Sequence, residues 1–264
     1  MVKCMETLIL LFISVLPVYL VGRYVYRKDK SREPKSLIMK LFFGGLGAFG
    51  LTIVLSLIIG LFFPSILAES FDTDLISLFF RVFFGIALVE EFSKWFFVYK
   101  IAYNNPEFDQ VYDMVVYAVF VALGFACIEN IFYVFEHGFG VGVMRGVLAV
   151  PGHACDGVFM GYYLSMAKVS ELKDDKESRD NNIMFSILVP VLLHGFYDYC
   201  LFSQNYILIG LFFVFIICLY VLSIGKLKNL SKINGKFKYK NNFCGYCGRP
   251  VDSDYCPNCG GKNE

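Results

Sequence analysis

The strongest constraint on the fold is a series of apolar stretches, each long enough to cross a lipid bilayer. Hydrophobic residues make up 57% of the 264 residues. They form continuous runs, whereas a membrane β-barrel needs short segments of alternating polarity. We therefore expect an all-α polytopic membrane protein. About seven transmembrane helices are predicted, at residues 6–22, 37–63, 75–99, 111–136, 142–168, 183–202 and 206–225.

The charges of the connecting segments predict how the helices cross the membrane. The first connection, RYVYRKDKSREPK, is strongly basic, whereas the second, PSILAESFDTD, contains no Lys or Arg. The connection at 168–182 and the segment 226–240 are again rich in lysine. Because Lys and Arg accumulate on the cytoplasmic side, we expect a plasma-membrane protein with its N-terminus outside and its C-terminus in the cytoplasm. Nothing in this pattern indicates a nucleic-acid partner.

The end of the chain predicts a separate metal-binding module. We divide the chain into a transmembrane domain (1–225), a basic juxtamembrane linker (226–242) and a zinc ribbon (243–264). Two C-x2-C pairs separated by eight residues supply four thiolates, the usual ligands of a structural Zn²⁺; they are Cys244, Cys247, Cys256 and Cys259. Thiolate ligands require a reducing compartment, which agrees with a cytoplasmic C-terminus. We expect the module to contact a cytoplasmic partner that the sequence does not identify.

Ionisable side chains lie inside several of the predicted spans. The clearest case is LVEEFSKWFF, which contains Glu90, Glu91 and Lys94. Charged groups are costly in hydrocarbon, so each is a candidate for a functional site. The other polar residues of the spans are Arg81, Glu129, Asn130, Arg145, His153, Asp156, His194 and Asp198.

The spacing of these residues places several of them on shared helix faces. Glu90 and Lys94 are four positions apart and share a face, and Glu91 lies about 100° from Glu90 around the helix. His194 and Asp198 have the same four-residue spacing. Two adjacent carboxylates repel each other where the dielectric is low, and a purely structural site does not need both. The set is therefore suited to handling protons or binding a metal.

Other features have structural interpretations. The pattern H-x3-G-x3-G that begins at His153 predicts a close approach by a neighbouring helix. Lys94 is more easily explained as neutralising a glutamate than as catalytic. Asn130 is expected to make a hydrogen bond between helices, and Arg145 is expected either to extend toward the membrane surface or to form a structural ion pair. Glu129 lies nearer the outer half of the membrane than Glu90.

Four motifs then identify a family resemblance. EEFSK, GFACIEN, R-x7-HACDGVFMGYY and HGFYDY occur in this order on successive spans. They resemble the PrsW family of intramembrane proteases, which belongs to the superfamily of the CAAX prenyl proteases and bacteriocin-processing enzymes. The resemblance covers roughly residues 75–200 and excludes the zinc ribbon. It implies hydrolysis of a peptide bond in a membrane-associated protein or peptide; the substrate of the bacterial protein that names the family is an anti-sigma factor.

The resemblance also implies roles for individual residues. The family's EExxK motif matches Glu90, Glu91 and Lys94, and its other motifs match Glu129, His153, His194 and Asp198. We expect Glu90, assisted by Glu91, to activate a water as general base. The two histidines would hold this water and stabilise the oxyanion, Asp198 would fix the tautomer of His194, and Lys94 would set the charge of the glutamates.

Two alternatives remain open from the sequence. The glutamate mechanism requires no cofactor, but two histidines and a glutamate also match a catalytic zinc site. A transporter or non-enzymatic scaffold is the rival class, because intramembrane Glu and His residues occur there too. Inverted repeats would favour a transporter, and the sequence contains none that we recognise.

Overall fold

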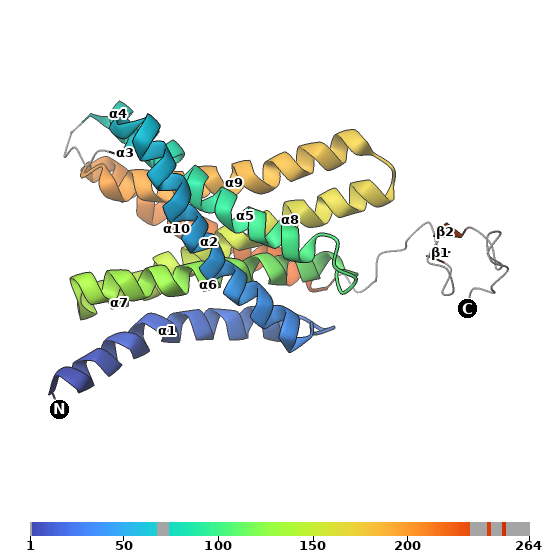
Figure 1. Cartoon of the computed structure of the whole chain (residues 1–264), viewed down its shortest axis with the longest axis horizontal. Coiled ribbons are helices and arrows are strands. Elements are labelled where there is room, and N and C mark those ends of the chain that lie inside the picture. The colour runs from blue at the N-terminus through green and yellow to red at the C-terminus, as the bar shows by residue number, and fades with distance from the viewer. Residues whose placement is uncertain (1, 68–73, 233–241, 244–249, 252–264) are drawn as a thin grey trace.

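A computed structural model describes residues 2–67, 74–232, 242–243 and 250–251, and Figure 1 shows that helices dominate it. Six described elements precede the α5–α6 connection. They are α1 (Val2–Lys28), α2 (Lys35–Phe62), the short α3 (Pro64–Leu67), α4 (Leu75–Phe80), and the π-helix η1 (Arg81–Ala87) continued by α5 (Leu88–Ala102). The remaining helices are α6 (Val111–His137), α7 (Phe139–Val147), α8 (Ala149–Leu172), α9 (Lys176–Phe202) and α10 (Tyr206–Leu230).

The fold is that of a multi-pass membrane protein. Within the described residues, five helices are long and apolar enough to cross a membrane: α1, α2, α6, α9 and α10. The third and fifth predicted spans are each built from more than one helical element, α4–η1–α5 and α7–α8. These two spans contain several charged residues, among them Glu90, Glu91 and Lys94 in the third, which lowers their hydropathy. The count of seven spans therefore stays a prediction.

Helix α6 forms the centre of the bundle. It packs against α1, α2, α5 and α8, and its side chains are buried along most of its length. Its sequence is apolar on every side, as expected for a helix enclosed by others. Large apolar side chains on the outer helices are instead exposed, for example Leu61 on α2 and Ile207 on α10. The exposed apolar surface is suited to contact with lipid.

Glycines allow α6 to approach its neighbours closely. A Cβ atom on Gly161 of α8 would lie only 2.5 Å from the carbonyl oxygen of Met114 on α6, and Gly157 meets the backbone of Val119 in the same way. Gly45 of α2 and Gly124 of α6 form a second close crossing. The close approach predicted from H-x3-G-x3-G is thus confirmed, and the partner is α6.

Two irregularities position the polar residues. The π-helix Arg81–Ala87 directly precedes Glu90 and Glu91 and packs against α9, where Gly195 makes room for the Phe83 ring. A break at Leu148 separates α7 from α8, which carries His153. Such π-turns are rare and concentrate at functional sites.

The C-terminal segment is described only in part. Strands β1 (Asn242–Phe243) and β2 (Pro250–Val251) pair antiparallel, with Asn242 opposite Val251. They flank the first C-x2-C pair, but all four predicted zinc ligands, Cys244, Cys247, Cys256 and Cys259, lie outside the described residues. Helix α10 continues to Leu230, so the predicted linker 226–242 begins as helix.

Candidate active site

A buried lysine holds the two adjacent glutamates together. The Lys94 ammonium nitrogen lies 2.7 Å from Glu91 Oε1 and 3.3 Å from Glu90 Oε2. The side chains of Glu91 and Lys94 are fully enclosed, while the Glu90 side chain is 12% exposed. Lys94 also lies 4.1 Å from the centre of the Phe125 ring, a cation–π contact with α6. Its position fits the expectation that Lys94 neutralises the glutamates.

His153 links this lysine to Glu129. Its Nδ1 atom lies 3.1 Å from Lys94 Nζ, and its Nε2 atom lies 2.8 Å from Glu129 Oε2. An ammonium group can only donate, so Nδ1 is the acceptor and carries no proton. The Nε2–H group then donates to Glu129. These contacts describe a neutral imidazole in one defined tautomer, with both ring nitrogens already engaged.

His194 is surrounded by carboxylates. Its Nδ1 atom lies 2.8 Å from Glu91 Oε1, and its Nε2 atom lies 3.4 Å from Asp198 Oδ2 and 4.0 Å from Glu90 Oε2. Asp198 was expected to fix the His194 tautomer, but the shortest contact of this ring is with Glu91. Both nitrogens face acceptors, so a protonated His194 can donate from each of them.

Glu129 joins the site despite its predicted position nearer the outer half of the membrane. Besides His153, its Oε2 atom contacts an Arg145 guanidinium nitrogen at 2.8 Å. Arg145 also donates from Nε to Asn130 Oδ1 at 3.2 Å and lies 3.9 Å from the centre of the Tyr133 ring. Arg145 therefore forms an ion pair within the site, one of the two placements expected for it.

Asn130 extends the network to the first helix. Its Nδ2 group donates to the carbonyl oxygen of Ser14 at 2.9 Å, which confirms the predicted hydrogen bond between helices. The chain of contacts thus runs from α1 through α6 and α7 to α8. It fixes Arg145, and Arg145 in turn fixes Glu129.

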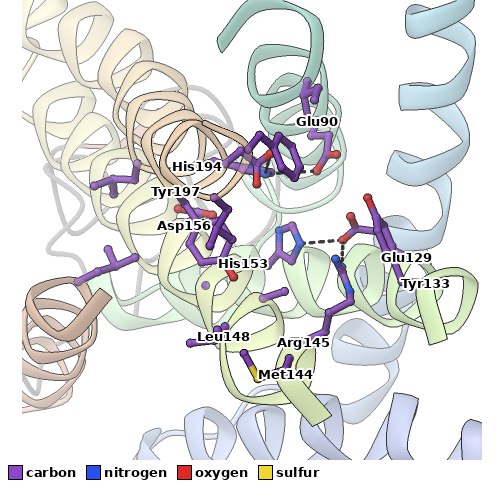
Figure 2. Close-up of a pocket in the computed structure, with 18 residues that line it drawn as sticks. Glu90, Glu129, Tyr133, Met144, Arg145, Leu148, His153, Asp156, His194 and Tyr197 are labelled. Atoms are coloured by element: carbon purple, nitrogen blue, oxygen red, sulfur yellow. Dashed lines mark hydrogen bonds and ion pairs between the residues drawn. The ribbon is translucent and has the colours of Figure 1, made fainter. Parts of the chain in front are cut away.

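A pocket of about 250 Å³ opens beside these residues. Figure 2 shows His153 between the Glu129–Arg145 pair and the group formed by Glu90 and His194. Glu91 and Lys94 are fully buried and are not among the residues that line the pocket. The polar residues of its wall are Glu90, Glu129, Tyr133, Arg145, His153, Asp156, His194, Tyr197 and Asp198.

Asp156 is a member of this wall to which the sequence did not assign a role. It follows His153 by three positions on α8, is 4% exposed, and its Oδ1 atom is buried without a hydrogen-bond partner among the described residues. Its position three residues after His153, which places both on one face of α8, could have suggested Asp156 from the sequence. Arg81, in contrast, does not line the pocket.

The site also offers a set of metal ligands. Glu90, Glu91, His153 and His194 each present one nitrogen or oxygen atom, and these atoms all lie within 4.8 Å of one another. Two imidazoles and two carboxylates suit Zn²⁺, so the residues present fit a metal by their chemistry. Three of the four, Glu90, Glu91 and His153, are also in contact with the Lys94 ammonium.

Comparison with known proteins gives one consistent family. A family model described as "PrsW family intramembrane metalloprotease" matches residues 33–224. A protein named Protease PrsW from Oceanobacillus iheyensis is 36% identical over 221 residues, 83% of this chain and 94% of that protein. Proteins of the same name from Clostridioides difficile and Bacillus subtilis are 30% and 36% identical, covering 88% and 67% of this chain and 95% and 76% of their own. No solved structure matches.

Proposed function

The chain belongs to the PrsW family of intramembrane proteases, and from this premise we propose that it cleaves a membrane-associated protein with a water activated by Glu90. The observation that carries the proposal is the different placement of the two adjacent glutamates. Glu90 lines the pocket, whereas Glu91 is fully buried and is held by Lys94 and His194. Of the two adjacent glutamates, Glu90 is the one with access to a water and a substrate in the pocket.

In the proposed reaction, the Glu90 carboxylate takes a proton from the attacking water as the water adds to the scissile carbonyl. His194, on the same wall of the pocket, donates a hydrogen bond to the oxyanion that forms. Glu90 then returns the proton to the departing amine, and the peptide bond breaks. Carboxylate bases positioned in this way contribute about 10²–10⁴-fold to a rate.

The residues around this pair act as positioning groups. Lys94 contacts both glutamates and so balances their charge without entering the pocket. His153 is held by Lys94 on one side and by Glu129 on the other. Glu91 accepts a hydrogen bond from Nδ1 of His194, which leaves the Nε2–H group, facing Asp198 at 3.4 Å, as the donor to the oxyanion.

A metal-dependent version is the second candidate, because the matching family is described as a metalloprotease. Glu90, Glu91, His153 and His194 would hold the ion, which would polarise the scissile carbonyl and acidify a bound water. The contacts of Lys94 favour the metal-free version. Its ammonium already serves as the cation for three of these four groups, and it would repel a divalent ion bound among them.

The test of the glutamate base is Glu90→Gln in cells. Membrane proteomics of cells with the wild-type chain or the variant should identify a protein, such as a single-span anti-sigma factor, that accumulates uncleaved only in the variant. Glu136→Gln is the matched control, because Glu136 lies on α6 with 73% of its side chain exposed. Undiminished cleavage by a folded Glu90→Gln protein would overturn the proposed mechanism.

Metal analysis separates the two mechanisms and tests the proposed zinc ribbon. The full chain should contain one structural zinc, and replacing the four ribbon cysteines by serine should remove it. Zinc that remains in this variant, and is then lost on His153→Ala, would establish the metal-dependent reaction. An active cysteine variant without bound metal would support the glutamate mechanism.

We also propose that the C-terminus is cytoplasmic. The basic α1–α2 connection, the α8–α9 connection and the end of α10 lie at one end of the bundle, opposite α3 and α4 (Figure 1). This common end supports the orientation expected from the positive charges. A cysteine-accessibility experiment with a membrane-impermeant reagent in intact cells, directed to a single cysteine in each connection, tests it.

A further inference from the structure

A second group of buried carboxylates lies far from the pocket. Asp29 and Glu33 belong to the α1–α2 connection, and Asp113 belongs to the first turn of α6. One oxygen of each lies within 4.8 Å of the others, and the three residues are only 5%, 6% and 0% exposed. Sixteen positions along α6 separate Asp113 from Glu129, about 24 Å of helix. The group is therefore distinct from the candidate active site.

Hydrogen bonds fix one oxygen of each carboxyl group. Asp29 Oδ1 accepts the Ser31 N–H, Glu33 Oε2 accepts the Tyr117 hydroxyl, and Asp113 Oδ2 accepts the N–H groups of Asp109 and Gln110. The second oxygens of the two aspartates, Asp29 Oδ2 and Asp113 Oδ1, are buried and accept no hydrogen bond from the described residues. A buried oxygen without a partner is costly, so these atoms call for a ligand that is a cation or a proton.

The charge of this group is not neutralised by an ion pair in the part of the chain that the structure describes. No ion pair within residues 2–67 and 74–232 involves any of the three carboxyls. Arg32 is near enough to act on Asp29 electrostatically, but its guanidinium lies over the Tyr26 ring. Burial raises the pKa of Glu33 to about 7, and the charges of Asp29, Glu107 and Asp109 act in the same direction. The local surroundings thus favour an added positive charge.

We propose that Asp29, Glu33 and Asp113 bind a hard divalent cation, of the Ca²⁺ and Mg²⁺ class, that ties the α1–α2 connection to the start of α6. Carboxylate oxygens are the ligands these ions prefer. With Ca²⁺–oxygen distances of about 2.3–2.6 Å, opposite ligands lie roughly 4.6–5.2 Å apart. A single ion can therefore contact three oxygens that lie within 4.8 Å of one another after at most a small shift of their side chains. Its effect would be to anchor the central helix of the bundle.

Terbium luminescence provides a direct test on the full chain in a neutral detergent. Tb³⁺ substitutes for Ca²⁺, and Tyr117, whose hydroxyl donates a hydrogen bond to Glu33, is placed to sensitise the Tb³⁺ emission. We expect a saturable signal that Ca²⁺ or Mg²⁺ displaces. Asp113→Asn and Asp29→Asn should each raise the Tb³⁺ concentration needed for half-saturation by at least about tenfold, because affinity follows the number of charged ligands. Glu107→Gln removes only a neighbouring charge, and Glu90→Gln removes a carboxylate of the pocket; both should leave the signal unchanged.

Thermal denaturation gives a second readout, in which the melting temperature of each protein is compared with and without divalent cations. Without divalent cations, Asp113→Asn should melt at a higher temperature than the wild type, because it removes a repelling charge. With Ca²⁺ or Mg²⁺, the melting temperature should rise in the wild type and not in this variant. An absent Tb³⁺ signal, an equal response of Asp113→Asn and Glu107→Gln, or stabilisation by acid and not by cations would overturn the proposal.

Discussion

Lys94 Nζ lies 3.1 Å from His153 Nδ1, a contact that joins α5 to α8 across 59 positions of the sequence. Through it, the carboxylate pair of one helix and the Glu129–Arg145 pair of two others become one continuous network. A change at either end should therefore affect the imidazole between them. The first two predictions test the two ends.

Replacing Lys94 by methionine should destabilise the protein strongly. Glu91 would remain buried without its cation, and breaking a buried pair in this way costs about 3–5 kcal/mol. The double variant Lys94→Met/Glu91→Gln should recover much of this stability, since it removes the uncompensated charge. Thermal denaturation in detergent measures both. A single variant as stable as the wild type would show that the pair is not needed for folding.

Arg145→Gln should slow substrate cleavage with little effect on folding. It removes an ion pair that holds Glu129, and hydrogen bonds to charged groups contribute about 1.5–3 kcal/mol, or roughly ten- to a hundredfold in rate. Arg145→Lys should restore part of the activity. Arg81→Gln removes the same charge from a residue outside the pocket and serves as the control. Equal losses in both glutamine variants would indicate a general effect of charge.

Gly161→Ala should separate α8 from α6. The added methyl group would meet the Met114 carbonyl oxygen at 2.5 Å, a distance that the backbone can avoid only by moving. We expect a lower melting temperature and a lower yield. Gly210→Ala is the matched change, because a Cβ atom on Gly210 of α10 meets nothing within 4 Å. It should be tolerated or slightly stabilising, as alanine favours helix over glycine.

The raised pKa of Glu33 predicts how the stability of the protein depends on pH when divalent cations are absent. Its pKa of about 7 in the folded protein lies above the ordinary value of 4.5. Between these values the folded state binds more protons than the unfolded state, so stability falls as pH rises from about 4.5 to about 7 and then levels off. Glu33→Gln should reduce the dependence of the melting temperature on pH across this range, while Glu107→Gln should retain it. A wild-type melting temperature that rises across this range would contradict the prediction.

Local spacing made the core of the candidate site predictable. The contacts predicted from the four-residue spacings, Glu90–Lys94 and His194–Asp198, are present in the structure because each pair lies on one helix. Gly157 of the HACDG motif allows α8 to pack closely against α6. The structure brings all seven residues predicted as catalytic into one network, although Asp198 makes a longer contact with His194 than Glu91 does. The roles assigned to these residues stay predictions.

What the sequence could not predict depends on packing between distant helices. Arg145 meets Glu129 because α7 packs against α6, and no periodicity in the chain indicates that packing. Asp29 and Glu33 lie in the α1–α2 connection, which the sequence marks mainly by the lysines and arginines that predict its cytoplasmic side. Their meeting with Asp113 requires the close approach of the α1–α2 connection to α6.

The π-helix that leads into Glu90 makes the chain tolerant of a change in length at this one place. A π-turn holds about one residue more than an α-turn. Losing one residue between Arg81 and Ala87 can therefore turn it into regular helix while Phe79 and Glu90 keep their present neighbours. The same deletion between Glu91 and Lys94 would rotate one carboxylate by about 100° away from the ammonium. Natural insertions and deletions should be accepted before the glutamates and excluded immediately after them.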